Sequence, residues 1–209
     1  MISILQFLII ISLTFVTTIF IGRKLAIGHN ISALIFIIHL CYCILYWYLY
    51  TQVGYSDAIF YFNTSFVTDF NWTPGNYFVI SITKVLADIF GLNMLNTFLA
   101  FNIFGIIGIQ FLLRVLLDIW PRSRNFSSYM PYFIILLPGQ SFWSSAIGKD
   151  GIAYLSVCIL LYGLHSNKYS YLIVSLFLMS IVRPHIAFVM LISFLIMFAV
   201  SKLNKSLFQ

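Results

Sequence analysis

The chain has 209 residues, of which 62% are apolar and only 8% are charged, and its mean hydropathy is +1.02. This composition excludes an ordinary soluble domain and indicates an integral membrane protein. The net charge of +6 does not indicate nucleic-acid binding, because lysine and arginine stand singly or in pairs beside apolar runs, as membrane topology signals do.

Seven apolar runs follow one another along the chain, and each is long enough, or nearly so, to cross a bilayer as a helix. The runs cover residues 2–22, 31–50, 96–117, 129–147, 151–164, 170–182 and 186–201. We therefore predict an all-α, polytopic helical membrane protein with about seven transmembrane helices. Residues 1–209 would form a single integral membrane domain, with one long loop over 51–95.

The basic residues are distributed unevenly between the two ends of these runs. One side carries eight of the 11 basic residues: Arg23, Lys24, Arg114, Arg122, Arg124, Lys168, Lys202 and Lys205. The other side carries the remaining three and four of the five aspartates. The positive-inside rule then predicts that the loop 51–95 and the N-terminus lie outside and that the C-terminus is cytoplasmic.

The external segment 51–95 carries signals for two short helices. Ser56 can cap a helix that begins at Asp57, and Thr73 followed by Pro74 is typical of a second helix start. Gly91 offers a stop for the second helix. Its polar face would comprise Ser81, Lys84 and Asp88. Such an amphipathic helix would lie in the membrane interface with its polar face toward water, either as a plain connection or as a platform for substrate.

Two charged clusters interrupt the apolar part of the chain, Lys149-Asp150 and Arg183-Pro184-His185. Asp150 and His165 are 15 residues apart, which is about 22 Å of helix against a hydrocarbon core of about 30 Å. Lys168 and Arg183 have the same separation, so both clusters are expected at a similar depth. Helix breaks at Pro138-Gly139 and Pro184 favour a wet cavity there, open to the outside. The alternative is a thin span whose charged ends reach the surface, with Lys149 paired only to Asp150.

This cavity has the chemical groups for sugar transfer from a lipid-linked phosphate. Asp57 can act as general base on a sugar hydroxyl, although an isolated external aspartate can also be merely solvated. Arg183 offers a planar fork to phosphate oxygens, and Lys149 or His185 can neutralise the charge on a leaving phosphate. Rings near Trp143 are candidates to stack on a sugar.

A metal or cofactor site is not indicated by any motif. The histidine, cysteine and aspartate residues lack the spacing of metal ligands or of a catalytic triad, and no phosphate-binding glycine loop occurs. We predict no cofactor, with a divalent metal ion as an open alternative.

The first external loop of C-type membrane glycosyltransferases resembles the stretch Tyr55-Ser56-Asp57-Ala58-Ile59-Phe60-Tyr61-Phe62. In those enzymes an aspartate followed by a tyrosine serves as the catalytic base. The stretch 138–150 together with Arg183-Pro184-His185 is similar to multi-span proteins of bacterial capsule, exopolysaccharide and O-antigen assembly. This resemblance covers roughly residues 50–195. Those proteins generally have more spans, so we expect a truncated member.

The resemblance implies a glycosyltransferase or polysaccharide polymerase in the bacterial inner membrane, acting at its outer face. The expected partner is a sugar linked to polyprenyl (undecaprenyl) phosphate. Asp57 would be catalytic, and Lys149, Asp150, Arg183 and His185 would bind the lipid phosphate or the substrate. The alternative is a non-catalytic transporter or assembly subunit of the same pathway, in which the charged clusters form a buried ion network and Asp57 is dispensable.

Overall fold

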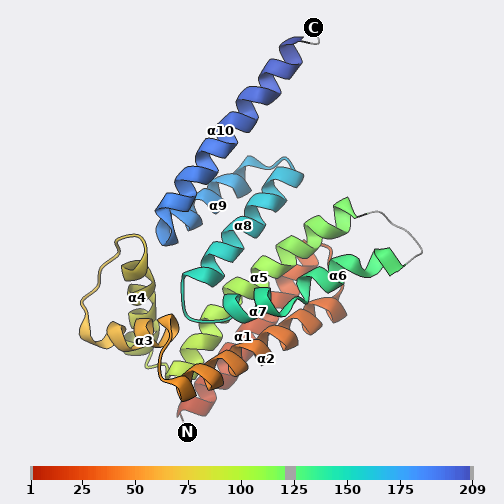
Figure 1. Cartoon of the computed structure of the whole chain (residues 1–209). Helices are drawn as coiled ribbons and strands as arrows, with labels where there is room; N and C mark the ends of the chain where they lie inside the picture. The colour runs from red at the N-terminus through yellow and green to blue at the C-terminus, as the bar shows by residue number, and fades with distance from the viewer. Residues whose placement is uncertain (1, 121–125, 208–209) are drawn as a thin grey trace.

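The computed structural model describes residues 2–120 and 126–207, and over these residues every regular element is a helix, so the all-α prediction is confirmed (Figure 1). The elements are α1 (Ile2–Lys24), α2 (His29–Val53), α3 (Asp57–Val67), α4 (Asn76–Lys84), the π-helical turn η1 (Val85–Ile89), α5 (Met94–Ile119), the 3-10 turn η2 (Phe126–Tyr129), α6 (Met130–Ile135), α7 (Pro138–Ser144), α8 (Lys149–His165), α9 (Tyr169–Val182) and α10 (Pro184–Leu207).

Three of the described helices, α1, α2 and α5, are long and apolar enough to cross a membrane, with 23, 25 and 26 residues. The apolar run 129–147 is interrupted as expected at Pro138, because α6 ends at Ile135 and α7 begins at Pro138. Proline has no backbone N–H and disfavours helical geometry at the preceding residue, so Leu137 is extended and the helix is interrupted. The break expected at Pro184 is confirmed, since α9 ends at Val182.

Helix α5 lies at the centre of the molecule and packs against α1, α2, α6, α7 and α8 (Figure 1). Two of its glycines allow the close approach. A Cβ atom at Gly105 would lie 2.5 Å from the carbonyl oxygen of Ser144 in α7, and one at Gly108 would lie 2.8 Å from the ring of Tyr154 in α8. Small residues at helix contacts let backbones come close, which is the main source of packing energy between membrane helices.

Helices α8 and α9 form a tight antiparallel hairpin. The buried hydroxyls of Ser156 and Ser175 each donate to the other residue's carbonyl oxygen, both at 2.8 Å. Near the turn, a Cβ atom at Gly163 would lie 2.9 Å from Leu172. This hairpin fixes the start of α8 opposite the end of α9, where the two charged clusters lie.

The segment between α2 and α5 folds into α3, α4 and η1, beside the ends of α2 and α9. Ser56 caps α3 as predicted, since its hydroxyl accepts from the Ile59 backbone N–H at 3.2 Å. The start predicted at Thr73-Pro74 is wrong: α4 begins at Asn76, after Gly75 with a φ of +100° that favours glycine. The Gly75 N–H donates to the carbonyl of Ile181, 2.8 Å away, and so ties this segment to α9.

The polar face predicted for the second external helix is only partly exposed. Lys84 and Asp88 form an ion pair at 3.1 Å, and Asp88 is exposed. Ser81, however, is buried and bonds both to the backbone N–H of Asn71 at 3.0 Å and to its carbonyl at 2.8 Å. That hydroxyl therefore holds the connecting loop in place instead of facing water.

Candidate functional site

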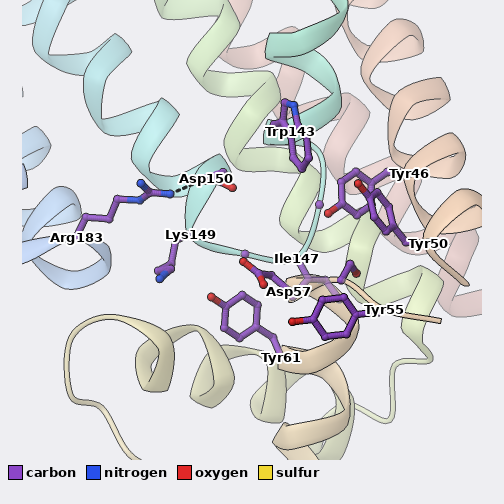
Figure 2. Close-up of a pocket in the computed structure, with 13 residues that line it drawn as sticks. Tyr46, Tyr50, Tyr55, Asp57, Tyr61, Trp143, Ile147, Lys149, Asp150 and Arg183 are labelled. Carbon is purple, nitrogen blue, oxygen red and sulfur yellow. Dashed lines mark hydrogen bonds and ion pairs between the residues drawn. The ribbon is translucent and has the colours of Figure 1, made fainter. Parts of the chain in front are cut away.

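A cavity of about 340 Å³ lies where the starts of α3 and α8 meet the junction of α9 and α10 (Figure 2). We call it the charged cavity. It is lined by Tyr46, Tyr50, Tyr55, Ser56, Asp57, Tyr61, Trp143, Ala146, Ile147, Gly148, Lys149, Asp150 and Arg183. Four of the five residues selected from the sequence therefore meet at one place, although they come from three separate parts of the chain.

Asp57 reaches the cavity because it is the first residue of α3. The Ser56 cap fixes the backbone there, and Gly54 turns the chain out of α2 with a φ of +78°. Figure 2 shows the Asp57 and Lys149 side chains both extending into the space between α3 and α8. Lys149 opens α8, so the cavity also faces the N-terminal end of that helix, whose free N–H groups favour an anion.

Arg183 and Asp150 form an ion pair across the cavity, drawn as a dashed line in Figure 2. The pair is partly open to solvent, with 34% of the Arg183 side chain and 53% of the Asp150 side chain exposed. Arg183 bonds Asp150 through one terminal nitrogen, while its Nε is buried without a hydrogen-bond partner among the described residues. The guanidinium therefore keeps terminal N–H groups that could donate to a second oxyanion.

Aromatic rings form the opposite wall of the cavity. The ring of Tyr46 lies 4.4 Å from that of Tyr50 and 6.1 Å from that of Trp143, measured between centroids. In Figure 2 Tyr46, Tyr50 and Tyr55 lie on the far side of Asp57 from Arg183. One cavity thus offers apolar faces to a ring at one end and positive charge at the other.

Tyr61 also lines the charged cavity and contributes a neutral hydroxyl. Burial raises its pKa to about 12, and the nearby carboxylates of Asp57 and Asp150 add to this effect. The phenol therefore stays protonated at neutral pH and donates to Asn76 Oδ1 at 3.0 Å. It lies within the charged cavity as a hydrogen-bonding group without adding charge.

The fifth selected residue, His185, is exposed and is not among the described residues that line the cavity. Arg183 lies in the short link between α9 and α10, with φ −144° and ψ +74°, whereas His185 already belongs to the first turn of α10.

The residues that sequence reasoning did not select are the tyrosines Tyr46, Tyr50 and Tyr61. Tyr46 and Tyr50 are one helical turn apart near the C-terminal end of α2, shortly before Asp57. That spacing was a usable signal, but many aromatic residues near span ends serve only as interface anchors.

No group of three or more histidine, cysteine, aspartate or glutamate side chains within the described ranges is arranged to hold a metal ion. No model of a known protein family matches the chain, and no curated protein or solved structure is significantly similar to it.

Proposed function

We propose that this protein is a membrane glycosyltransferase or polysaccharide polymerase that uses a sugar linked to polyprenyl phosphate. The observation that carries the proposal is the charged cavity, in which Asp57 shares one space with Lys149 and Arg183. A carboxylate, two cations and a wall of aromatic rings are the groups that transfer of a sugar from a phosphate carrier requires. The pathway is bacterial surface polysaccharide assembly, in line with the resemblance of the Asp57 and Lys149-Asp150 motifs.

In this reaction Asp57 accepts the proton of an acceptor hydroxyl as its oxygen bonds to the anomeric carbon of the donor sugar. The bond from that carbon to the phosphate oxygen breaks, and the phosphate leaves with the electron pair. Lys149 and the free donors of Arg183 stabilise the added negative charge on the phosphate. The aromatic rings around Tyr46 hold the apolar face of the sugar.

The proposal includes an orientation in the bacterial inner membrane. The chain crosses seven times, with α6 and α7 together as a broken fourth crossing, the N-terminus and charged cavity outside and the C-terminus in the cytoplasm. Helix α8 has 17 residues, about 25 Å of rise against a core of about 30 Å, so its outer end and the cavity lie below the membrane surface. A lipid phosphate could then enter from the bilayer.

A non-catalytic transporter or assembly subunit is the second candidate. The Asp150–Arg183 ion pair favours it, because such a pair can serve only to join α8 to the α9–α10 junction. In that protein Asp57 would be an ordinary exposed carboxylate at a helix start.

Replacement of Asp57 by asparagine separates the two candidates. Asp57→Asn keeps the shape of the side chain but cannot take a proton, so we expect glycan formation to fall about 10²- to 10⁴-fold at an unchanged protein level. Asp69→Asn is the matched control, because Asp69 is also an exposed aspartate of the external segment but does not line the charged cavity. Normal glycan formation by Asp57→Asn would favour the assembly subunit.

A further inference from the structure

A second hollow of about 320 Å³ adjoins the charged cavity on its α7 side. We call it the side hollow. It lies between α7 and α8 and is lined by Gly139, Gln140, Trp143, Ser144, Asp150 and Tyr154. Trp143 and Asp150 line both spaces, so the side hollow and the charged cavity are direct neighbours.

The side hollow differs from the charged cavity in its chemistry. Among the described residues Asp150 is the one charged residue in its lining, and that carboxylate is already paired with Arg183. The remaining polar groups are neutral and held in place. The Tyr154 hydroxyl donates to Gln140 Oε1 at 2.8 Å, and Gln140 Nε2 donates to the carbonyl of Ile134 at 3.3 Å, beside the helix break before α7.

Trp143 supplies a large apolar face between the two spaces. It is 52% exposed, and an edge-to-face contact with Phe142 at 5.4 Å between ring centroids holds its ring. A sugar ring has one apolar face and several hydroxyls at its edge. An indole face beside a phenol and an amide matches that combination, whereas a phosphate or a sugar acid would find no cation in this hollow.

We propose that the side hollow binds an uncharged sugar residue next to the one that reacts in the charged cavity. The inference rests on the proposed function, and it makes one substrate an oligosaccharide instead of a single sugar. Trp143 stacks on the added residue, and the Tyr154 hydroxyl accepts a hydrogen bond from it. The phosphate end of the substrate stays with Lys149 and Arg183.

Gly139 allows the side hollow to be filled without altering the charged cavity. A Cβ atom added there meets no other atom within 4 Å, and Gly139 does not line the charged cavity. Gly139→Leu therefore places a branched side chain in the open space, while Gly139→Ala adds one methyl group and serves as the control for the loss of glycine.

The test measures sugar binding by saturation-transfer NMR on the full chain in lipid nanodiscs. The probes are the uncharged methyl pyranosides of glucose, galactose, mannose, rhamnose, N-acetylglucosamine and N-acetylgalactosamine. We expect at least one of these glycosides to bind the wild type. Its binding should be lost in Gly139→Leu and retained in Gly139→Ala. Tyr154→Phe should bind it about 3- to 10-fold more weakly, the effect of one neutral hydrogen bond. Binding unchanged in Gly139→Leu, or no binding of any glycoside, would overturn the inference.

A second probe separates this inference from the proposed function. Undecaprenyl phosphate, measured by native mass spectrometry, should bind the wild type and Gly139→Leu alike and should bind Arg183→Lys more weakly. Glycoside binding that depends on Gly139, with no binding of undecaprenyl phosphate, would leave the side hollow as a sugar site and remove the proposed donor. The reverse result would keep the donor and remove the sugar site.

Discussion

Arg183 lines the charged cavity and pairs with Asp150. Its role as a phosphate ligand and its role as a structural partner depend on different properties of the guanidinium. As a phosphate ligand it needs the planar fork, because one terminal nitrogen is already bonded to Asp150 and the other donors must reach a second oxyanion. As a structural partner it needs only its positive charge. The ion pair itself adds little stability, since more than half of the Asp150 side chain is exposed to solvent.

We therefore expect Arg183→Lys to weaken binding of undecaprenyl phosphate by about 10- to 100-fold, the range for loss of a charge-assisted hydrogen bond. The thermal unfolding midpoint of Arg183→Lys in detergent should stay close to that of the wild type. Arg183→Ala should lower the midpoint only slightly, because the ion pair with Asp150 is partly exposed to solvent. Native mass spectrometry and a thermal melt on the same preparations give both values. Unchanged lipid affinity in Arg183→Lys would exclude the phosphate contact.

At the scale of elements, the position of α7 decides the shape of both hollows. This short helix has only seven residues, and its end is held by the contact of Ser144 with α5. Gly105 makes that contact possible, because any side chain there would overlap the Ser144 carbonyl. His39 of α2 packs on the same glycine and bonds Asn102 of α5 at 3.0 Å, so three helices converge at this point.

Gly105→Ala should accordingly destabilise the protein. Its Cβ would lie 2.5 Å from the Ser144 carbonyl and 2.8 Å from His39 Cε1, so α7 or α2 must shift, at a cost of about 1–3 kcal/mol. The measurement is the thermal unfolding midpoint in detergent. Gly139→Ala, which meets open space, serves as the reference and should melt like the wild type. Equal midpoints for the two variants would show that α5 and α7 are not in close contact.

At the scale of the whole molecule, charged residues gather at both ends of the α8–α9 hairpin. One end has Lys149, Asp150 and Arg183 near α3. At the other end His165 lies 3.2 Å from Asp118 of α5, which forms an ion pair with Arg114 at 2.5 Å. Figure 1 shows α3 and α4 at one end of the helices and the α8–α9 turn toward the other. The proposed orientation places the first end outside the cell.

Cysteine labelling from outside the cell tests this orientation. In a background with Cys41, Cys43 and Cys158 replaced by alanine, Thr73→Cys should react with a membrane-impermeant maleimide in intact cells. Lys168→Cys, in the α8–α9 turn, should react only after the membrane is opened, because the positive-inside rule places it in the cytoplasm. Both positions are exposed to solvent, so accessibility of the side chain does not limit either reaction. Labelling of Lys168→Cys alone in intact cells would invert the topology.

Local signals in the sequence determined the helices and several of their ends. Long apolar runs specified α1, α2 and α5, because a bilayer admits few structures other than helices. The Ser56 cap and the breaks at Pro138 and Pro184 depend on neighbouring residues alone, and each was predicted correctly. Equal helix rise also placed Asp150 and Arg183 at one depth, and the structure joins them in an ion pair.

Which side chains share the cavity depends on tertiary packing. Asp57 and Lys149 line one cavity because the start of α3 lies near the start of α8, and no spacing in the sequence encodes this for residues 92 positions apart. The N-cap of the second helix was predicted at Thr73 but lies at Gly75. Hydrogen bonds from Ser81 to Asn71 and from Gly75 to Ile181 hold the loop before α4 in place. His185 does not line the cavity, although it lies only two residues from Arg183. Depth along a helix follows from residue count, but the direction of a side chain around the helix axis is set by packing against its neighbours.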